Sequence, residues 1–293
     1  MTSGVLLLDK PAGLSSNAAL QRVRRLYGAD KAGHVGSLDP LATGMLPICL
    51  GEATKVAGEL LGGRKCYRFA VLLGTRTSTG DLEGEVIETA PVAPLERAAV
   101  TAVLAAFCGR QAQTPPMYSA LKHGGQPLYR LARAGLEVER AAREIEVFSL
   151  QLLKLEPRSL ELQVVCSKGT YVRTLAEDVA RALGSCGHVG SLRRLYVEPF
   201  AEEHMKELAQ LEADAARGAL PPLTPADRVL PGMEAVAVPA AEASRLLHGQ
   251  PVTLARCSAR GRVRLYDERG RFLGLGEADG AGGVRPKRLF LDA

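Results

Sequence analysis

Apolar and polar residues follow two periodicities along the chain, and together they predict an α+β fold. The segment from Gly4 to Lys10 is almost entirely apolar, which is typical of a buried strand, and Pro11 ends it. Further strands are predicted at 67–73, 85–89, 145–155 and 160–167. Apolar residues three and four positions apart predict helices at 15–27, 95–108 and 174–183.

The ends of two helices carry recognisable signals. Ser15 or Ser16 can cap the first helix, and Gly28 ends it. Thr174 and Glu177 have the spacing of a capping box. Residues 168–173 therefore lie at a junction between a strand and a helix, where side chains can point into a site.

Two changes of pattern divide the chain. Residues 110–143 have little apolar periodicity and read as a long insertion that is partly helical around 128–134; insertions of this length are usually functional or mobile. Prolines interrupt 220–232, as in an interdomain linker, and the last sixty residues alternate like a small β-domain. We therefore expect one domain over 1–232 and a second over 233–293.

Composition is that of a globular protein, with 46% hydrophobic and 24% charged residues. No apolar run approaches the roughly 18 residues of a membrane span, and Val5 to Leu8 is too short for a signal peptide. We expect a cytoplasmic protein without membrane contact. The six cysteines form no Cys-x-x-Cys pair, and the five histidines are scattered, so neither a metal nor another cofactor is expected.

Positive charge is concentrated near the C-terminal end. Residues 256–288 hold nine basic and four acidic side chains, a surplus equal to the +5 of the whole chain. A solvated face explains such clustering, but the excess of arginine over lysine also favours a partner rich in phosphate.

The segment 33–47 is the strongest candidate for chemistry. It reads as a loop rich in glycine and proline, and Asp39 is the only acidic residue between Lys31 and Gly51. Glycines allow sharp turns, and Pro40 biases Asp39 toward extended backbone. A single carboxylate held in such a scaffold suits a nucleophile.

Three other segments have both a chemical and an ordinary interpretation. Lys168 to Arg173 offers an arginine to pair with Asp39, or else a surface arginine and a core tyrosine. Lys65 to Phe69 places Tyr67 as a stacking surface for a base, or simply in the core. Thr75 to Asp81 is a polar turn. An aspartate, an arginine and an aromatic without metal suit glycoside cleavage or base isomerisation, but glycosidases usually need a second carboxylate.

These motifs resemble those of the bacterial tRNA pseudouridine synthase B family. The resemblance rests on DKPAGLSS at 9–16, GHVGSLDPLATGMLP at 33–47, KCYRFAVLLGTRTSTGDLEG at 65–84, QTPPMYSALKHGGQPLYRLAR at 113–133 and KGTYVRTLAEDVARALG at 168–184. It covers about residues 4–200. It implies a mixed, mostly antiparallel sheet flanked by helices, and more loosely a PUA-like RNA-binding β-domain at the end.

The resemblance also implies an activity, the isomerisation of the flipped-out uridine at position 55 in the tRNA T-loop to pseudouridine. Asp39 would be the nucleophile, attacking either the anomeric carbon or C6. Tyr67 would stack on the uracil and be available for the C5 proton, and Arg173 would pair with Asp39. The remaining implied substrate contacts are Lys10, His34, Asp81, Tyr171 and Leu192. The freed base must also be kept from water, and the apolar wall expected for this is Leu38, Leu41, Met45 and Leu192.

Two alternatives remain open at this point. The protein could bind or fold RNA with a catalytically silent pocket, or it could belong to the guide-RNA-dependent branch of the superfamily. The insertion at 110–143 favours a guide-free enzyme, because such an enzyme must grip its substrate itself. We expect a monomer that acts on the T-arm of tRNA without guide RNA.

Overall fold

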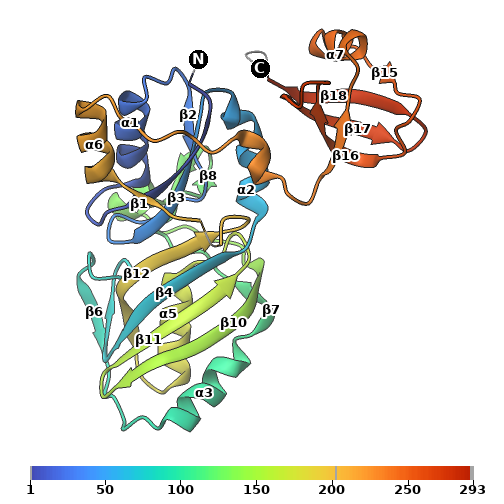
Figure 1. Ribbon diagram of the computed structural model, residues 1–293. Coiled ribbons are helices and arrows are strands. Elements are labelled where there is room, and N and C mark those ends of the chain that lie inside the picture. The colour runs from blue at the N-terminus through green and yellow to red at the C-terminus, as the bar shows by residue number, and fades with distance from the viewer. Residues whose placement is uncertain (1, 202, 291–293) are drawn as a thin grey trace.

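The computed structural model describes residues 2–201 and 203–290, which form one large sheet, flanking helices and a smaller C-terminal sheet (Figure 1). The large sheet has the order β13-β1-β3-β12-β4-β11-β10-β7, with β2 paired to β3. The pairs β1–β13 and β3–β12 are parallel and its other pairs antiparallel, so the predicted mixed, mostly antiparallel sheet is confirmed. Its strands are β1 (Gly4–Lys10), β2 (Ala32–His34), β3 (Thr43–Leu50), β4 (Lys65–Leu73), β7 (Gly109–Gln113), β10 (Arg143–Glu156), β11 (Ser159–Cys166), β12 (Gly187–Val197) and β13 (Lys206–Glu207).

Helices pack on both faces of this sheet. They are α1 (Ser16–Leu26), η1 (Gly51–Val56), α2 (Ala57–Gly62), α3 (Arg97–Ala106), α5 (Val172–Ala182), α6 (Leu208–Ala216) and η2 (Ala226–Val229). Helix α4 (Leu128–Arg133) lies in a segment that leaves the sheet, and α7 (Ala240–Leu247) packs in the C-terminal domain. Apolar side chains of α1, α3, α5 and α6 form one core with Leu6 and Leu8, whereas those of η1, α2 and η2 form a second core with Val5 and Leu7. Strand β1 is thus buried on both faces, which explains why its sequence is an uninterrupted apolar run.

Helix α1 begins as predicted, whereas α5 does not. Ser15 Oγ accepts a hydrogen bond from the Ala18 amide at the start of α1. Helix α5 begins at Val172, two residues before the predicted start, and its N-cap, Tyr171, makes no side-chain cap bond. The predicted capping box of Thr174 and Glu177 is therefore wrong, because Thr174 lies inside the helix. As a result, Arg173 belongs to the first helical turn.

The segment 33–47 is only partly a loop. Strand β2 occupies its first residues and β3 its last, leaving 35–42 between them. Gly44 shows why a glycine is needed here: its φ is +99°, and a Cβ would lie 2.1 Å from the Arg194 carbonyl oxygen. This close approach lets β3 lie beside β12.

The segment that leaves the main sheet is shorter than the predicted insertion. Residues 109–113 form β7, which pairs with β10, so the excursion begins after Gln113. It contains the short hairpin of β8 (Lys122–His123) and β9 (Gln126–Pro127), followed by α4, close to the predicted helical stretch. The polar segment at 75–81 begins with β5 (Thr75–Thr77), which pairs with β6 (Val86–Thr89) in a small hairpin.

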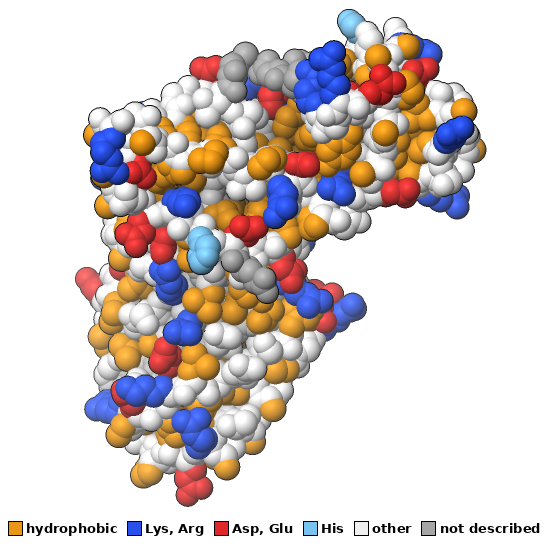
Figure 2. Space-filling model, in the orientation of Figure 1, with side chains coloured by type: hydrophobic (Ala, Val, Ile, Leu, Met, Phe, Trp, Pro, Cys, Tyr) orange, Lys and Arg blue, Asp and Glu red, His pale blue; other side chains and the backbone are white. Residues whose placement is uncertain are grey.

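The C-terminal residues form a five-stranded sheet in the order β14-β16-β17-β18-β15, as expected for a small β-domain. Leu275 and Phe290 of this sheet pack into the second core of the body, and Arg262 forms an ion pair with Glu59 at 2.6 Å. Figure 2 shows a hollow where the body and this domain meet at an angle. The strands are β14 (Glu234–Ala237), β15 (Val252–Thr253), β16 (Arg260–Tyr266), β17 (Phe272–Asp279) and β18 (Gly283–Leu289).

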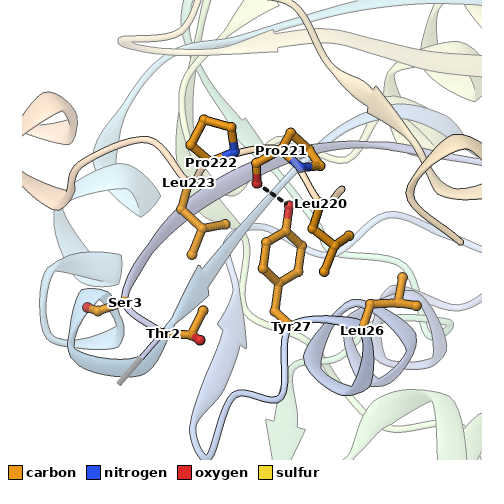
Figure 3. Close-up of a pocket in the computed structure, with 8 residues that line it drawn as sticks. All are labelled: Thr2, Ser3, Leu26, Tyr27, Leu220, Pro221, Pro222 and Leu223. Atoms are coloured by element: carbon orange, nitrogen blue, oxygen red, sulfur yellow. Dashed lines mark hydrogen bonds between the residues drawn. The ribbon is translucent and has the colours of Figure 1, made fainter. Parts of the chain in front are cut away.

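A surface pocket of about 430 Å³ lies where the connecting segment 220–223 crosses α1 and the N-terminal residues (Figure 3). The Tyr27 hydroxyl donates to the Pro221 carbonyl oxygen at 2.9 Å. Val5 and Thr224 exchange backbone hydrogen bonds at 2.8 Å in both directions. None of the predicted site residues lines this pocket, so its contacts serve to fasten the connection to the body.

Candidate active site

Asp39 lies in the short loop between β2 and β3, and neighbouring backbone holds that loop in place. Ser16 at the start of α1 bonds Leu38 twice: its Oγ accepts from the Leu38 amide at 2.7 Å and donates to the Leu38 carbonyl at 2.9 Å. The Gly13 amide donates to the Pro40 carbonyl at 2.8 Å. The Asp39 side chain nevertheless remains 36% exposed, so a substrate can reach it.

Arg173 forms the predicted pair with Asp39. Its Nε is 3.0 Å from Asp39 Oδ2, and its Nη2 donates to Oδ1 at 3.3 Å. The same guanidinium donates to the carbonyl oxygens of Thr79 at 2.7 Å and Tyr118 at 2.6 Å. Because Arg173 is buried and these partners come from three segments, it fixes the carboxylate in both position and orientation.

Asp81 lies behind Arg173 rather than on the open side of the site. Its side chain is buried, and Oδ2 is 3.8 Å from Arg173 Nε. Its Oδ1 accepts hydrogen bonds from the Thr79 hydroxyl at 2.5 Å and the Glu83 amide at 3.0 Å. In this structure Asp81 is therefore placed to hold Arg173 and the turn around it, and its predicted contact with the substrate stays a prediction.

The charges around Asp39 act in opposite directions. Burial raises the pKa of the Asp39 carboxyl, the Arg173 guanidinium lowers it, and the neighbouring Asp81 carboxylate raises it again. Lys10 lowers it from the other side of the loop. The net effect is a raised pKa, so the Asp39 carboxylate, paired with Arg173, is more basic than that of an exposed aspartate.

Lys10 is wholly buried, which differs from the RNA contact that the resemblance implies. Its Nζ donates to the carbonyl oxygens of Leu14 at 2.7 Å, Pro11 at 2.8 Å and Pro40 at 3.3 Å. Burial lowers the pKa of Lys10 to about 8, although the Asp39 carboxylate opposes this shift. Through these hydrogen bonds, Lys10 links the segment 11–14 to the loop that carries Asp39.

Tyr67 and Leu192 lie together on adjacent strands of the sheet. Tyr67 on β4 is 7% exposed and Leu192 on β12 is 6% exposed, and both belong to the core that includes Leu38. Arg68 points away and is exposed, as the alternation predicts. Met45, expected in the same apolar wall, packs into the core on the opposite face of the sheet, because successive side chains of a strand point to opposite faces.

Tyr171 and His34 occupy the rim. The Tyr171 backbone is held by Gln113, whose Oε1 accepts from the Tyr171 amide at 2.8 Å and whose Nε2 donates to its carbonyl at 3.1 Å. His34 on β2 is partly exposed, but its Nδ1 is buried with no hydrogen-bond partner among the described residues. Burial, and then the charge of Arg194, lower the pKa of His34, which favours the neutral ring.

Sequence reasoning missed Gln113, Lys65 and Arg194. Gln113 was assigned to the insertion, although it ends a strand of the sheet. Lys65 is buried and donates to two carbonyls at the end of α2, and burial lowers its pKa to about 8. Arg194 is fully buried beside Tyr67. The sequence carried no clear signal for Arg194, because register shifts break the alternation within 187–197 and only the pairing with β4 places it.

The arrangement offers a carboxylate nucleophile paired with an arginine, a buried tyrosine and an apolar wall. No group of three or more His, Cys, Asp or Glu residues that could hold a metal ion occurs within 2–201 and 203–290. No helix in those residues is long and apolar enough to cross a membrane.

The chain matches the model of the TruB family pseudouridylate synthase N-terminal domain over residues 24–172, more than half of its length. The chain belongs to the TruB family. Residues 173–236 match a tRNA pseudouridylate synthase B C-terminal domain, and 235–290 match the C-terminal model of pseudouridine synthase II TruB. The protein is therefore an isomerase of the pseudouridine synthase class.

Relatives of this TruB protein are similar over nearly their full length. The tRNA pseudouridine synthase B of Aromatoleum aromaticum is 52% identical over 289 residues, covering 99% of this chain and 93% of the relative. That of Chromohalobacter salexigens is 51% identical, covering 98% and 94%.

Solved structures agree on the fold. An H/ACA RNP bound to a substrate RNA containing 2'-deoxyuridine includes a chain that matches with a TM-score of 0.74 and 21% identity, covering 99% of this chain and 86% of that chain. A Cbf5-Nop10-Gar1 complex matches with a TM-score of 0.73 and 23% identity, covering 98% and 84%. These similarities confirm the pseudouridine synthase sheet with a C-terminal β-domain.

Proposed function

We propose that this TruB protein converts the uridine at position 55 of the tRNA T-loop to pseudouridine, with Asp39 as the nucleophile. The observation that carries this assignment is the fork between Arg173 and Asp39, 3.0 and 3.3 Å long, in a site that stays open to solvent on the Asp39 side. A nucleophilic carboxylate must be ionised and fixed in direction, and a bidentate arginine meets both needs.

The other side chains fit the later steps of the isomerisation. The substrate uracil must leave its N-glycosidic bond, turn and rejoin through C5, where a proton is then removed. Tyr67 is the neighbouring group that can stack on the ring and accept that proton. Leu192 and Leu38 provide an apolar wall that keeps water from the detached base. Tyr171 and His34 on the rim are the proposed contacts to the flipped nucleotide and the RNA around it.

We further propose that the enzyme works in the cytoplasm as a monomer and without guide RNA. All of the proposed catalytic groups come from one chain, and the excursion after Gln113 reaches the site through the Tyr118 carbonyl bonded to Arg173. We place the catalytic domain at 1–232 and the RNA-binding β-domain at 233–293. Arg256, Arg260, Arg269, Arg285 and Arg288 in the latter form no ion pair with described residues, so they are available for phosphates.

The deciding experiment measures tritium release from C5-labelled uridine in an unmodified tRNA transcript, with no guide RNA added. We expect wild-type protein to release tritium. Asp39→Asn should release none and still bind the transcript, since it keeps the shape of the side chain and loses only the charge.

The two alternatives give different results in the same assay. Tight binding without release by wild type would identify an RNA-binding protein and refute the enzymatic assignment. Release that requires an added guide RNA would place the protein in the guide-dependent branch. A transcript with cytidine at position 55 serves as the control for the site of reaction.

A further inference from the structure

Arg194 is a fully buried cation with an unusual set of partners. Its Nε donates to the Met45 carbonyl and its Nη2 to the Gly36 carbonyl, both at 2.7 Å. No carboxylate within residues 2–201 and 203–290 forms an ion pair with it. A buried charge without a counter-ion is expensive to desolvate, so backbone carbonyls alone account poorly for an arginine at this position.

The backbone register places Arg194 directly opposite Tyr67. The two residues are Cα partners in the antiparallel pairing of β12 with β4. The guanidinium carbon lies 6.0 Å from the centre of the Tyr67 ring. Side chains of directly opposed residues lie on the same face of a sheet, which brings the charge of Arg194 to the phenol.

Arg194 also touches the loop that carries the nucleophile. Besides the bond to the Gly36 carbonyl, its Nη1 lies 3.1 Å from where a Cβ of Gly36 would be. Gly36 precedes Asp39 by three residues. One side chain therefore contacts both the loop between β2 and β3, which carries Asp39, and Tyr67 on β4.

We propose that Arg194 is a positioning residue for the isomerisation: it aligns Tyr67 with the Asp39 loop and holds its positive charge beside the phenol that accepts the C5 proton. The proposal rests on the proposed function. In the step concerned, the C5–H bond breaks, its proton passes to the Tyr67 oxygen, and its electron pair forms the C5–C6 double bond. The π pair of the C6–N1 double bond moves to N1, which takes up a proton from solvent. The proton on the Tyr67 oxygen then exchanges with solvent.

The groups around Arg194 and Tyr67 shift the pKa of the Tyr67 phenol in opposite directions. Burial raises the pKa of Tyr67, and the Arg194 charge opposes that effect; Cys166 on β11 and Asp39 on the loop raise it. His34 on β2 and Lys65 on β4 lie on the other side of Arg194, and its charge lowers the pKa of each. Arg194 is thus the principal group near Tyr67 that favours its ionised form.

The test places 3-fluorotyrosine at position 67 and follows its titration by ¹⁹F NMR. Fluorine makes the phenol more acidic, which brings the titration into a range where the fold survives. We expect Arg194→Met to move the titration upward, and Arg194→Lys to move it less because the charge is retained. Arg193→Met is the matched control: its side chain pairs with Asp9 at 2.6 Å, and the titration should not move.

Single-turnover rates measured on the unfluorinated variants provide the second readout. We expect Arg194→Met to lower the rate at pH 7 by about tenfold or more, with tRNA affinity little changed, and Arg194→Lys to restore part of it. A purely structural role would lower thermal stability and leave the titration in place.

An unchanged titration in folded Arg194→Lys and Arg194→Met proteins overturns the proposal. If Arg194→Met does not fold, Arg194→Gln decides by the same criterion, because it also removes the charge. Failure of the proposed function has a different signature, because wild type would then release no tritium whatever the titration of residue 67.

Discussion

At the scale of single residues, buried cationic side chains hold the loop that carries Asp39. Arg173 holds the Asp39 carboxylate directly. Lys10 donates to a backbone carbonyl of the loop that carries Asp39, and Arg194 on β12 donates to another carbonyl of the same loop. Asp81 in turn faces Arg173 from behind. The position of Asp39, the proposed nucleophile, is therefore fixed by buried groups.

The Arg173→Lys variant should separate two effects of Arg173, its positive charge and its control of the orientation of the Asp39 carboxylate. Lysine keeps the positive charge and loses the planar fork, so the carboxylate is no longer held by two parallel bonds. We expect kcat to fall by about a hundredfold, as for other small misplacements of a reacting group, with little change in tRNA affinity. Single-turnover rates and equilibrium binding measure the two effects. A loss of affinity with unchanged turnover would contradict the pairing role.

Lys10→Met should change stability in a pH-dependent way. Burial lowers the pKa of Lys10 in the folded protein to about 8, below the 10.5 of an unperturbed lysine. Between these values the unfolded chain binds more protons, so Lys10 contributes increasing stability as the pH rises from about 8.

The melting temperatures of wild type and Lys10→Met, compared between pH 7 and pH 10, measure this contribution. The variant should be less stable at every pH because three carbonyls lose their donor, and the difference should widen toward high pH. Exposed Lys31, changed to Met, is the control and should show no such widening. A difference that narrows with rising pH would refute the assigned environment.

At the scale of elements, the sequence predicted the helices and strands whose apolar residues follow one regular spacing. Strand β1, helix α1 and the strands β10 and β11 match their predicted ranges closely, since apolar spacing alone defines them. Strand β12 was missed because Arg193 and Arg194 interrupt its apolar positions. One of these arginines is exposed and the other is buried, and only the paired strands decide which.

The sequence predicted which residues belong to the candidate site better than it predicted how they are arranged. Asp39, Arg173 and Tyr67 came from motifs and lie together, whereas Lys10 and Asp81 came from the same motifs and are buried behind the reacting groups. Sequence motifs identify residues that belong to a site but not the side from which each acts. The roles of Gln113 and Arg194 depend on strand pairing, which a single sequence does not reveal.

Gly44→Ala tests the junction of β3 and β12 as an element. A Cβ would lie 2.1 Å from the Arg194 carbonyl oxygen, at a φ of +99° that other residues avoid. We expect a loss of at least about 2 kcal/mol of stability, by denaturant unfolding, together with a loss of activity. Gly58→Ala in α2 is the control: nothing lies near its Cβ, and a neutral or stabilising effect is expected. Equal effects of the two changes would contradict this account.

At the scale of the whole molecule, the C-terminal sheet is fastened to the body and presents its unpaired arginines outward. Leu275 and Phe290 enter the second core, and the Lys55 ammonium donates to the Leu289 carbonyl at 2.6 Å. An RNA that contacts both parts would thus meet two surfaces held at a fixed angle, which suits recognition by shape.

Changing Arg285 and Arg288 together to Ala should weaken tRNA binding mainly at low salt. Each phosphate contact that is lost reduces the dependence of log K on log salt by about one, so we expect a slope smaller by about one to two. Binding measured at several salt concentrations gives the slope, and chemistry on bound tRNA should continue at the wild-type rate. Changing Arg22 and Arg25 of α1 together to Ala provides the comparison; an equal change in slope would show that the effect is one of net charge.

The strand order has a consequence for synthesis on the ribosome. Strand β12 lies between β3 and β4, and β13 pairs with β1 at one edge, so residues 187–207 complete both the middle and one edge of the sheet. Asp39 and Tyr67 leave the exit tunnel more than a hundred residues before Arg194, their shared neighbour. The nascent chain must therefore carry an incomplete sheet with open strand edges for much of its translation, and the catalytic site can assemble only once this late segment has emerged.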